Sequence, residues 1–138
     1  MRLQILRKDQ EPIQNYQHVF IEDGNIDLTQ IVDNQCKSIV ASDIFDSFSS
    51  TSRLELIKAM TSKLRIGGEL VVGGTDGRVL AKMITNGSLD IEEASSVISN
   101  LRSVASASVV SEAIQQFGLR VMSATINGLH YEVKAVRG

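Results

Sequence analysis

Residues 38–76 constrain the fold of this chain more than any other stretch, because they describe two apolar strands joined by an amphipathic helix. The first strand, residues 38–41, is apolar on both faces, which is typical of the middle of a parallel sheet. Ser52 and Glu55 form a capping box that predicts the start of the helix, and apolar residues then recur at helical spacing. Residues 70–72 predict the second buried strand. A strand, a helix and a strand in this order indicate a parallel crossover.

Glycine-containing pairs predict where several elements end. Residues 67–68, Gly-Gly, are predicted to turn the chain out of the helix, because glycine readily takes the positive φ that a helix exit needs. Residues 73–77, G-G-T-D-G, are predicted to form a flexible turn. Residues 127–128, Asn-Gly, are the strongest short hairpin signal and join two alternating runs, 119–126 and 129–136. The chain is therefore expected to end in an antiparallel hairpin.

The remaining sequence continues the alternation of strands and helices. Strands are predicted over residues 3–6 and 18–22, helices over residues 79–84, 90–101 and 109–117, and either a brief strand or a helical turn over residues 26–32. This order predicts the α/β class, with a mostly parallel sheet flanked by helices and a C-terminal antiparallel β-hairpin. The length of 138 residues predicts a single domain, residues 1–138.

Composition argues against several functional classes. A net charge of −2 gives no electrostatic support for binding nucleic acid or an anionic membrane. No apolar run approaches the roughly 20 residues of a membrane span, and the N-terminal residues lack the apolar core of a signal peptide, so we expect a cytoplasmic protein. The lone Cys36 cannot form an internal disulfide and is interpreted as a small, semi-buried residue. His18 and His130 lack metal-ligand spacing with other donors, so no metal site is predicted.

Three short motifs occur in an order typical of one enzyme family. Residues 41–48, A-S-D-I-F-D-S-F, stand where that family has an S-H-V-L-E-H loop after a strand. Residues 64–68, L-R-I-G-G, match its L-K-P-G-G turn with Ile66 in place of proline, and residues 75–76, Thr-Asp, stand where Pro-Asp often follows. Over nearly its whole length the chain thus resembles the small class I S-adenosylmethionine-dependent methyltransferases, of the type 11-like kind. The resemblance implies a Rossmann-like methyltransferase fold.

The resemblance also implies where cofactor-binding residues would lie. Glu22 is the candidate for the ribose-binding acid that ends the second strand, and Ser42, Asp43 and Ile44 follow a central strand at its carboxyl end. Asp43 could accept a hydrogen bond from an adenine or a substrate amine. The alternative interpretation is that Glu22 is a strand-end residue, and that Asp43, together with Asp46, is a solvated residue capping the next helix. No catalytic residue follows from the pattern.

The segment that should hold the cofactor contains no glycine. The family glycines would fall at Leu6 and Lys8, where the main chain must turn tightly beside the methionine part of the cofactor. We therefore expect a degenerate, non-catalytic domain without a cofactor, which acts as a structural or protein-interaction subunit bound to a protein partner or to further copies of itself. One alternative is an active methyltransferase using S-adenosylmethionine in an altered pocket, because methyl transfer needs mainly proximity and alignment. Another is a small-molecule binder that reuses the cleft.

Overall fold

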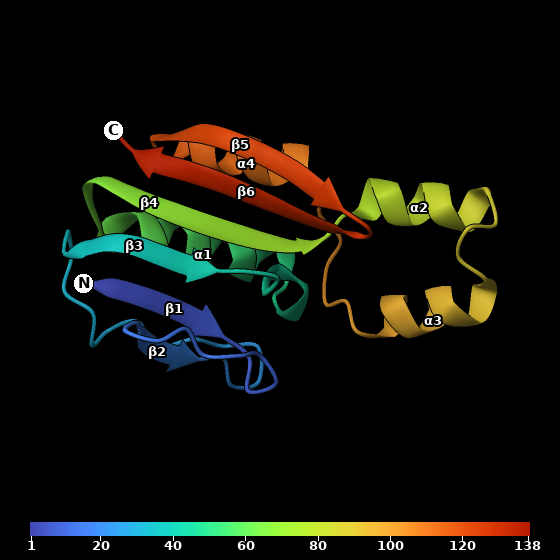
Figure 1. Ribbon diagram of the computed structural model, residues 1–138, viewed down its shortest axis with the longest axis horizontal. Helices are drawn as coiled ribbons and strands as arrows, with labels where there is room; N and C mark the ends of the chain where they lie inside the picture. Colours follow the sequence, from blue (N-terminus) through green and yellow to red (C-terminus); the bar gives the residue numbers. More distant parts are fainter.

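The computed structural model describes all residues 1–138 and contains one six-stranded sheet in the order β2-β1-β3-β4-β6-β5 (Figure 1). The strands are β1 (Arg2–Leu6), β2 (Gln17–Phe20), β3 (Cys36–Ala41), β4 (Leu64–Thr75), β5 (Leu119–Asn127) and β6 (His130–Arg137). The helices are α1 (Ser50–Lys63), α2 (Gly77–Thr85), α3 (Ile91–Ser99) and α4 (Ala107–Gln116), with a short 3₁₀ helix η1 (Phe45–Ser47).

The sheet is parallel except at β6. Strands β2, β1, β3 and β4 pair in parallel, whereas β6 runs antiparallel between β4 and β5. The chain leaves β1 toward β2 on one side and continues through β3 and β4 on the other, so the strand order reverses between β1 and β3. The predicted α/β class, with its C-terminal hairpin, is confirmed. Both chain ends lie at the end of the sheet opposite to α2 and α3 (Figure 1).

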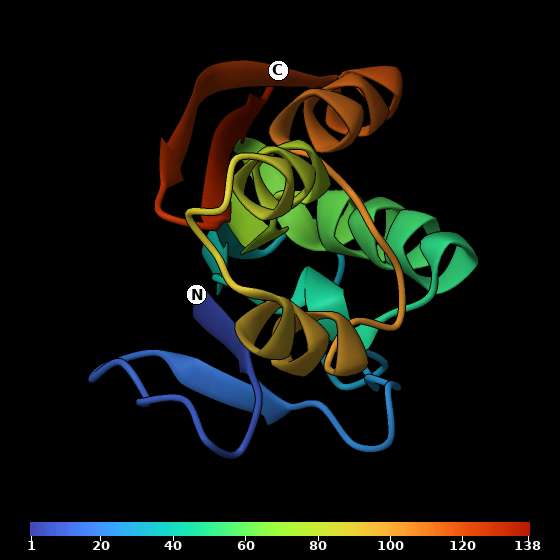
Figure 2. The same ribbon diagram turned by 90° about the vertical axis from the view of Figure 1, so that its right-hand side faces the viewer.

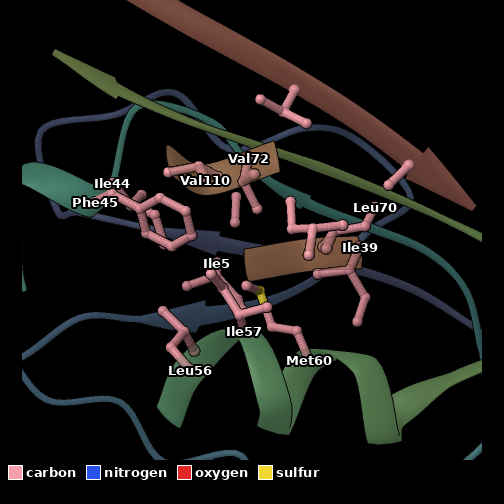
Figure 3. Packing of buried hydrophobic residues seen from close by; sticks show 14 of the residues in the cluster. Ile5, Ile39, Ile44, Phe45, Leu56, Ile57, Met60, Leu70, Val72 and Val110 are labelled. Carbon is pink, nitrogen blue, oxygen red and sulfur yellow. The ribbon is translucent and has the colours of Figure 1, made fainter. Parts of the chain in front are cut away.

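The main hydrophobic core lies between the sheet and the helices α1 and α4. A cluster of 25 buried residues joins the strands to both helices. In Figure 3, Ile57 and Met60 of α1 point toward Ile5 and Ile39 of the sheet. Full burial of each aliphatic side chain of this kind contributes about 1.5–3 kcal/mol, so this cluster fixes the helices on the sheet. Figure 2 shows α1 and α4 beside the strands, with α2 and α3 nearest the viewer.

Helix α1 begins earlier than the sequence predicts. Its N-cap is Ser49, whose hydroxyl accepts a hydrogen bond from the backbone N–H of Ser52 at 3.1 Å. The predicted capping box at Ser52 is therefore wrong, because Ser52 already lies inside the first turn. The apolar stripe is also shifted: Arg53 is buried and its guanidinium donates to Ser103, whereas Leu54 is 44% exposed.

Strand β4 includes the predicted helix exit at residues 67–68 and the first three residues of the predicted glycine turn at residues 73–77. Gly67 has a φ of +80° and lies where the pairing of β3 with β4 shifts register. Gly73 and Gly74 are strand residues paired with Glu132 and Tyr131 of β6, so the predicted flexible turn at residues 73–77 is wrong. A Cβ atom on Gly73 would stand 2.5 Å from the carbonyl oxygen of Tyr131. Glycine is needed there because another backbone approaches too closely for a side chain.

The other predicted elements are found with small changes in their ends. The helices α2, α3 and α4 and the β5–β6 hairpin are present, and β2 ends at Phe20 rather than at residue 22. Residues 26–32 form neither a strand nor a helix, so the prediction for this segment is wrong; they connect β2 to β3 through turns. None of the helices combines the length and apolar character needed to cross a lipid bilayer.

Candidate functional site

The carboxyl ends of β1 and β3 form the position where open α/β sheets usually bind ligands, since the strand order reverses between them. The connection from β1 to β2, residues 7–16, passes this position without forming a helix, although a parallel crossover usually contains one. Buried Gln4 holds this connection in place. Its amide donates to the carbonyl oxygen of Glu11 at 3.1 Å and accepts from the N–H of Ile13 at 2.7 Å.

Two side chains of this connection cross the crevice between β1 and β3. The guanidinium of Arg7 donates a hydrogen bond to the carbonyl oxygen of Asp43, and the amide of Gln10 donates to that of Ser42 at 2.8 Å. Gln10 also accepts from the backbone N–H of Arg7 at 2.8 Å, so the two crossing residues support each other. The protein's own side chains therefore bridge the crevice.

The residues at the expected glycine positions lie elsewhere. Leu6 is completely buried in the sheet. The side chain of Lys8 is 74% exposed and its ammonium lies 3.9 Å from the carboxylate of Glu22. The bulk that fills the crevice thus comes from Arg7 and Gln10, which the glycine pattern did not single out.

Glu22 lines a strongly polar cavity at the carboxyl ends of β1 and β2, on the other side of Arg7 from β3. This cavity has a volume of about 650 Å³ and one apolar residue among the ten that line it, Ile21. Its charged groups are Arg7, Lys8, Asp9, Glu22, Asp23 and Arg102. Arg102 reaches over Gly24, where an added Cβ would stand 2.1 Å from its Nη1 atom. An adenine ring favours an apolar slot, which this lining does not supply.

The three predicted residues after β3 point to different places. Ile44 is completely buried in the main core, where it lies beside Phe45 (Figure 3). Ser42 is half-buried, and its carbonyl oxygen is occupied by Gln10. Asp43 has a φ of +58°, which aspartate tolerates better than most residues, and its carboxylate is turned toward His130. Asp43 is the one charged residue of the three, and its side chain is partly exposed to solvent.

Asp43 and His130 form a pair that no local sequence pattern indicates. Nδ1 of His130 lies 2.9 Å from Oδ1 of Asp43, and the pair borders a cavity of about 400 Å³. The cavity is also lined by Ser42, Gly73, Thr125, Asn127, Tyr131 and Glu132. A carboxylate on one imidazole nitrogen leaves the other free to exchange a proton with a ligand. The pair joins residues 87 positions apart, so only the topology, with β6 beginning beside the end of β4, could have indicated it.

Other polar groups near the site have structural partners. Asp46 accepts hydrogen bonds from the N–H and hydroxyl of Thr75 at 2.8 and 2.6 Å, so it is not the solvated cap of α1 that one interpretation expected. Asp76 accepts from the backbone at the starts of α2 and α4.

Cys36 is completely buried, and this burial raises the pKa of its thiol, which disfavours the reactive thiolate.

Comparison with known proteins finds similarity at the level of structure. No protein-family model and no curated protein matches the chain. An S-adenosylmethionine-dependent methyltransferase from Mesorhizobium loti superposes with a TM-score of 0.67 at 8% identity, covering 99% of this chain and 90% of that one. An O-methyltransferase family protein from Burkholderia thailandensis superposes with a TM-score of 0.62 at 13% identity, covering 88% of this chain and 36% of that one.

A third similar structure comes from a complex. The complex contains the Haloferax volcanii Trm112 methyltransferase activator and a putative methyltransferase. The matched chain superposes with a TM-score of 0.58 at 9% identity, covering 91% of this chain and 63% of the matched chain. The chain thus spans less than two thirds of the Burkholderia and Haloferax proteins. At these identities the similarity establishes the architecture. This chain has the fold of the class I S-adenosylmethionine-dependent methyltransferases.

Proposed function

We propose that this chain is a non-catalytic, methyltransferase-like domain that takes up no S-adenosylmethionine in the usual crevice and acts by binding another protein chain. The observation that carries the proposal is the bridge that Arg7 and Gln10 make to the carbonyl oxygens of Asp43 and Ser42. The resemblance to the methyltransferase family implies that the methionine part of the cofactor would meet the main chain at this turn after β1.

The bridge opposes cofactor binding in two ways. A ligand in the crevice would displace both side chains, because the loop after Leu6 contains no glycine that would let the main chain make room. Displacement would also leave two partly buried carbonyl oxygens without their present donors, at a cost of about 1–3 kcal/mol for each that stays unpaired. The polar lining around Glu22 supplies no compensating apolar contact for the adenine.

Calorimetric titration of the full chain with S-adenosylmethionine and with S-adenosylhomocysteine tests this proposal. We expect no heat of binding and no thermal shift at millimolar ligand. The double variant Arg7→Ala with Gln10→Ala removes the bridge, and Lys58→Ala is the matched control because its exposed side chain lies on α1, outside the crevice and the cavity around Glu22. Micromolar binding by the unaltered chain, roughly −8 kcal/mol, would contradict the proposal.

The Asp43–His130 pair supports a second candidate, an active methyltransferase with an altered pocket. The pair offers a free imidazole nitrogen beside a cavity at the carboxyl ends of β3 and β4. An acceptor hydroxyl or amine held there could lose its proton to His130. This candidate requires cofactor binding, so the same titration separates the two functions.

A further inference from the structure

The end of the sheet opposite to the crevice carries a cluster of basic side chains. Parallel strands begin at the same end of a sheet, and β1, β3 and β4 all begin on the left of Figure 1. Arg2 is the first residue of β1, and Lys37 and Arg65 are the second residues of β3 and β4. Because these three strands are neighbours in the sheet, the topology brings the three cations to one place, although they are far apart in the sequence.

The three basic residues line one cavity of about 430 Å³. The pairing of β3 with β4 shifts register here, so residues 65–68 of β4 stand opposite Lys37 alone. A bulge of this kind bends its strand and re-aims the side chains. The volume lies within the range of about 300–1,000 Å³ that is typical of small-ligand sites. The other lining residues are Tyr16, Ser38, Gly67 and Glu69.

The lining of this cavity is positively charged, although the chain as a whole is not. Three cations and one carboxylate, that of Glu69, give the lining a formal charge of +2, whereas the whole chain carries −2. None of the three cations has a partner within the chain, since its ion pairs and side-chain hydrogen bonds use other arginines and lysines. Like charges gathered in this way repel one another. An anion in the cavity would relieve that repulsion.

The neutral groups of the cavity can also bind an anion. The hydroxyls of Tyr16 and Ser38 lie 3.5 Å apart, and their hydrogen bond uses one of the two protons, so the other can be donated to a ligand. A guanidinium group matches two phosphate oxygens at once, and an ammonium group adds a point charge. Tyr16 is the single hydrophobic residue of the lining. The cavity therefore suits a ligand rich in anionic oxygens better than an apolar one.

We propose that this cavity binds a small phosphate-bearing ligand with two or more negative charges. Arg2 and Arg65 hold its phosphate oxygens, and Lys37 lies on the strand between them. A small ligand is favoured over a nucleic acid because the cations line a single cavity on a chain of negative net charge, whereas nucleic-acid-binding domains carry a basic stripe and are basic overall. The site lies at the other end of the sheet from the bridged crevice, so the inference goes beyond the proposed function and does not depend on it.

Calorimetric titration of the full chain with inorganic pyrophosphate tests the site. The chain carries no added tag, because both of its ends lie at this end of the sheet (Figure 1). We expect saturable binding at low ionic strength, with a dissociation constant on the order of 10⁻⁴ M. An increase from about 0.01 to 0.15 M salt should weaken it tenfold or more, since the three cations belong to exposed residues and are screened. Absence of binding at about 10 mM pyrophosphate would overturn the proposal.

Paired removal of charges identifies the binding residues. Arg2→Gln with Arg65→Gln should weaken pyrophosphate binding tenfold or more. Arg78→Gln with Lys82→Gln is the matched control: it removes the same two charges from exposed residues of α2, beyond the opposite end of the sheet, and should leave the affinity unchanged (Figure 1). Circular dichroism checks that each variant is folded. An equal loss in the two double variants would show a response to net charge alone and would overturn the site.

A gain of affinity provides a test that unfolding cannot imitate. Glu69→Gln removes the one carboxylate of the lining, so it should tighten pyrophosphate binding severalfold. An unchanged or weaker affinity would show that the ligand does not lie beside Glu69, which would overturn its placement in this cavity.

Competition distinguishes the class of ligand. A short single-stranded oligonucleotide should bind more weakly than pyrophosphate, because its charges extend beyond the three cations of the cavity. An oligonucleotide that displaces pyrophosphate at equal concentration would overturn the choice of a small ligand in favour of a nucleic acid.

Discussion

The hydroxyl of Tyr131 is buried without a hydrogen-bond partner, and burial raises the pKa of this phenol well above its usual range. The ring itself belongs to the main core. In the unfolded chain the phenol ionises near pH 10, whereas in the folded chain it stays neutral to higher pH. The unfolded state therefore releases this proton first, and the folded state loses stability as the pH rises above 10.

Tyr131→Phe keeps the ring and removes the unpaired hydroxyl. At pH 7 we expect a stability equal to the unaltered chain or up to about 1 kcal/mol higher, because no hydrogen bond is lost. Above pH 10 the variant should lose less stability than the unaltered chain. Urea denaturation between pH 7 and 11.5 measures both effects, with Tyr16→Phe as the control at a half-buried phenol. Parallel alkaline declines in the unaltered chain and in Tyr131→Phe would show that Tyr131 is not their cause.

Gly73 illustrates a second constraint on single residues, the close approach of two backbones. We expect Gly73→Ala to destabilise the fold by about 1–3 kcal/mol or more, because its Cβ would meet the carbonyl oxygen of Tyr131 at 2.5 Å and the paired strand cannot move aside freely. Gly138→Ala is the control, since nothing lies within 4 Å of a Cβ there. Thermal unfolding compares the two, and equal stabilities would show that β4 and β6 can separate at this pair.

Among the elements, those defined by local patterns could be predicted from the sequence. The β5–β6 hairpin follows from Asn127-Gly128, and α2 to α4 follow from apolar residues at helical spacing. The ends of elements were harder to predict because neighbouring residues offer competing signals. Residues 49–52 contain three serines and a threonine, so several caps for α1 were available, and the capping box at Ser52 and Glu55 favoured the wrong one. The path of β4 through glycines 73 and 74 depends on pairing with β6, which no local pattern contains.

Helix α1 offers a direct comparison of the two caps. Ser49→Ala should cost about 1 kcal/mol of stability, within a range of about 0.5–2, because the first turn loses the acceptor for the N–H of Ser52. Ser52→Ala should cost less, since its side chain caps no backbone group. Denaturant unfolding at pH 7 distinguishes them, and a larger loss for Ser52→Ala would restore the capping box that the sequence suggested.

For the whole molecule, the sheet topology could be predicted, whereas the contents of the site could not. The missing glycines indicate an altered crevice, but the residues that cross it contact β3 over long separations, 36 positions for Arg7 and 32 for Gln10. The Asp43–His130 pair spans 87 positions. Contacts of this kind depend on which strand ends meet, so they can be read from the sequence only after the strand order is known. The predicted roles of Glu22, Ser42, Asp43 and Ile44 in cofactor binding stay predictions for the titration to test.

The antiparallel course of β6 returns the C-terminus to the end of the sheet at which β1 begins, so both chain ends emerge there (Figure 1). A fluorophore or an affinity handle attached to either end is thus held remote from α2, α3 and the bridged crevice. Immobilised or labelled protein therefore keeps the crevice accessible, and a tagged preparation can serve for the S-adenosylmethionine titration.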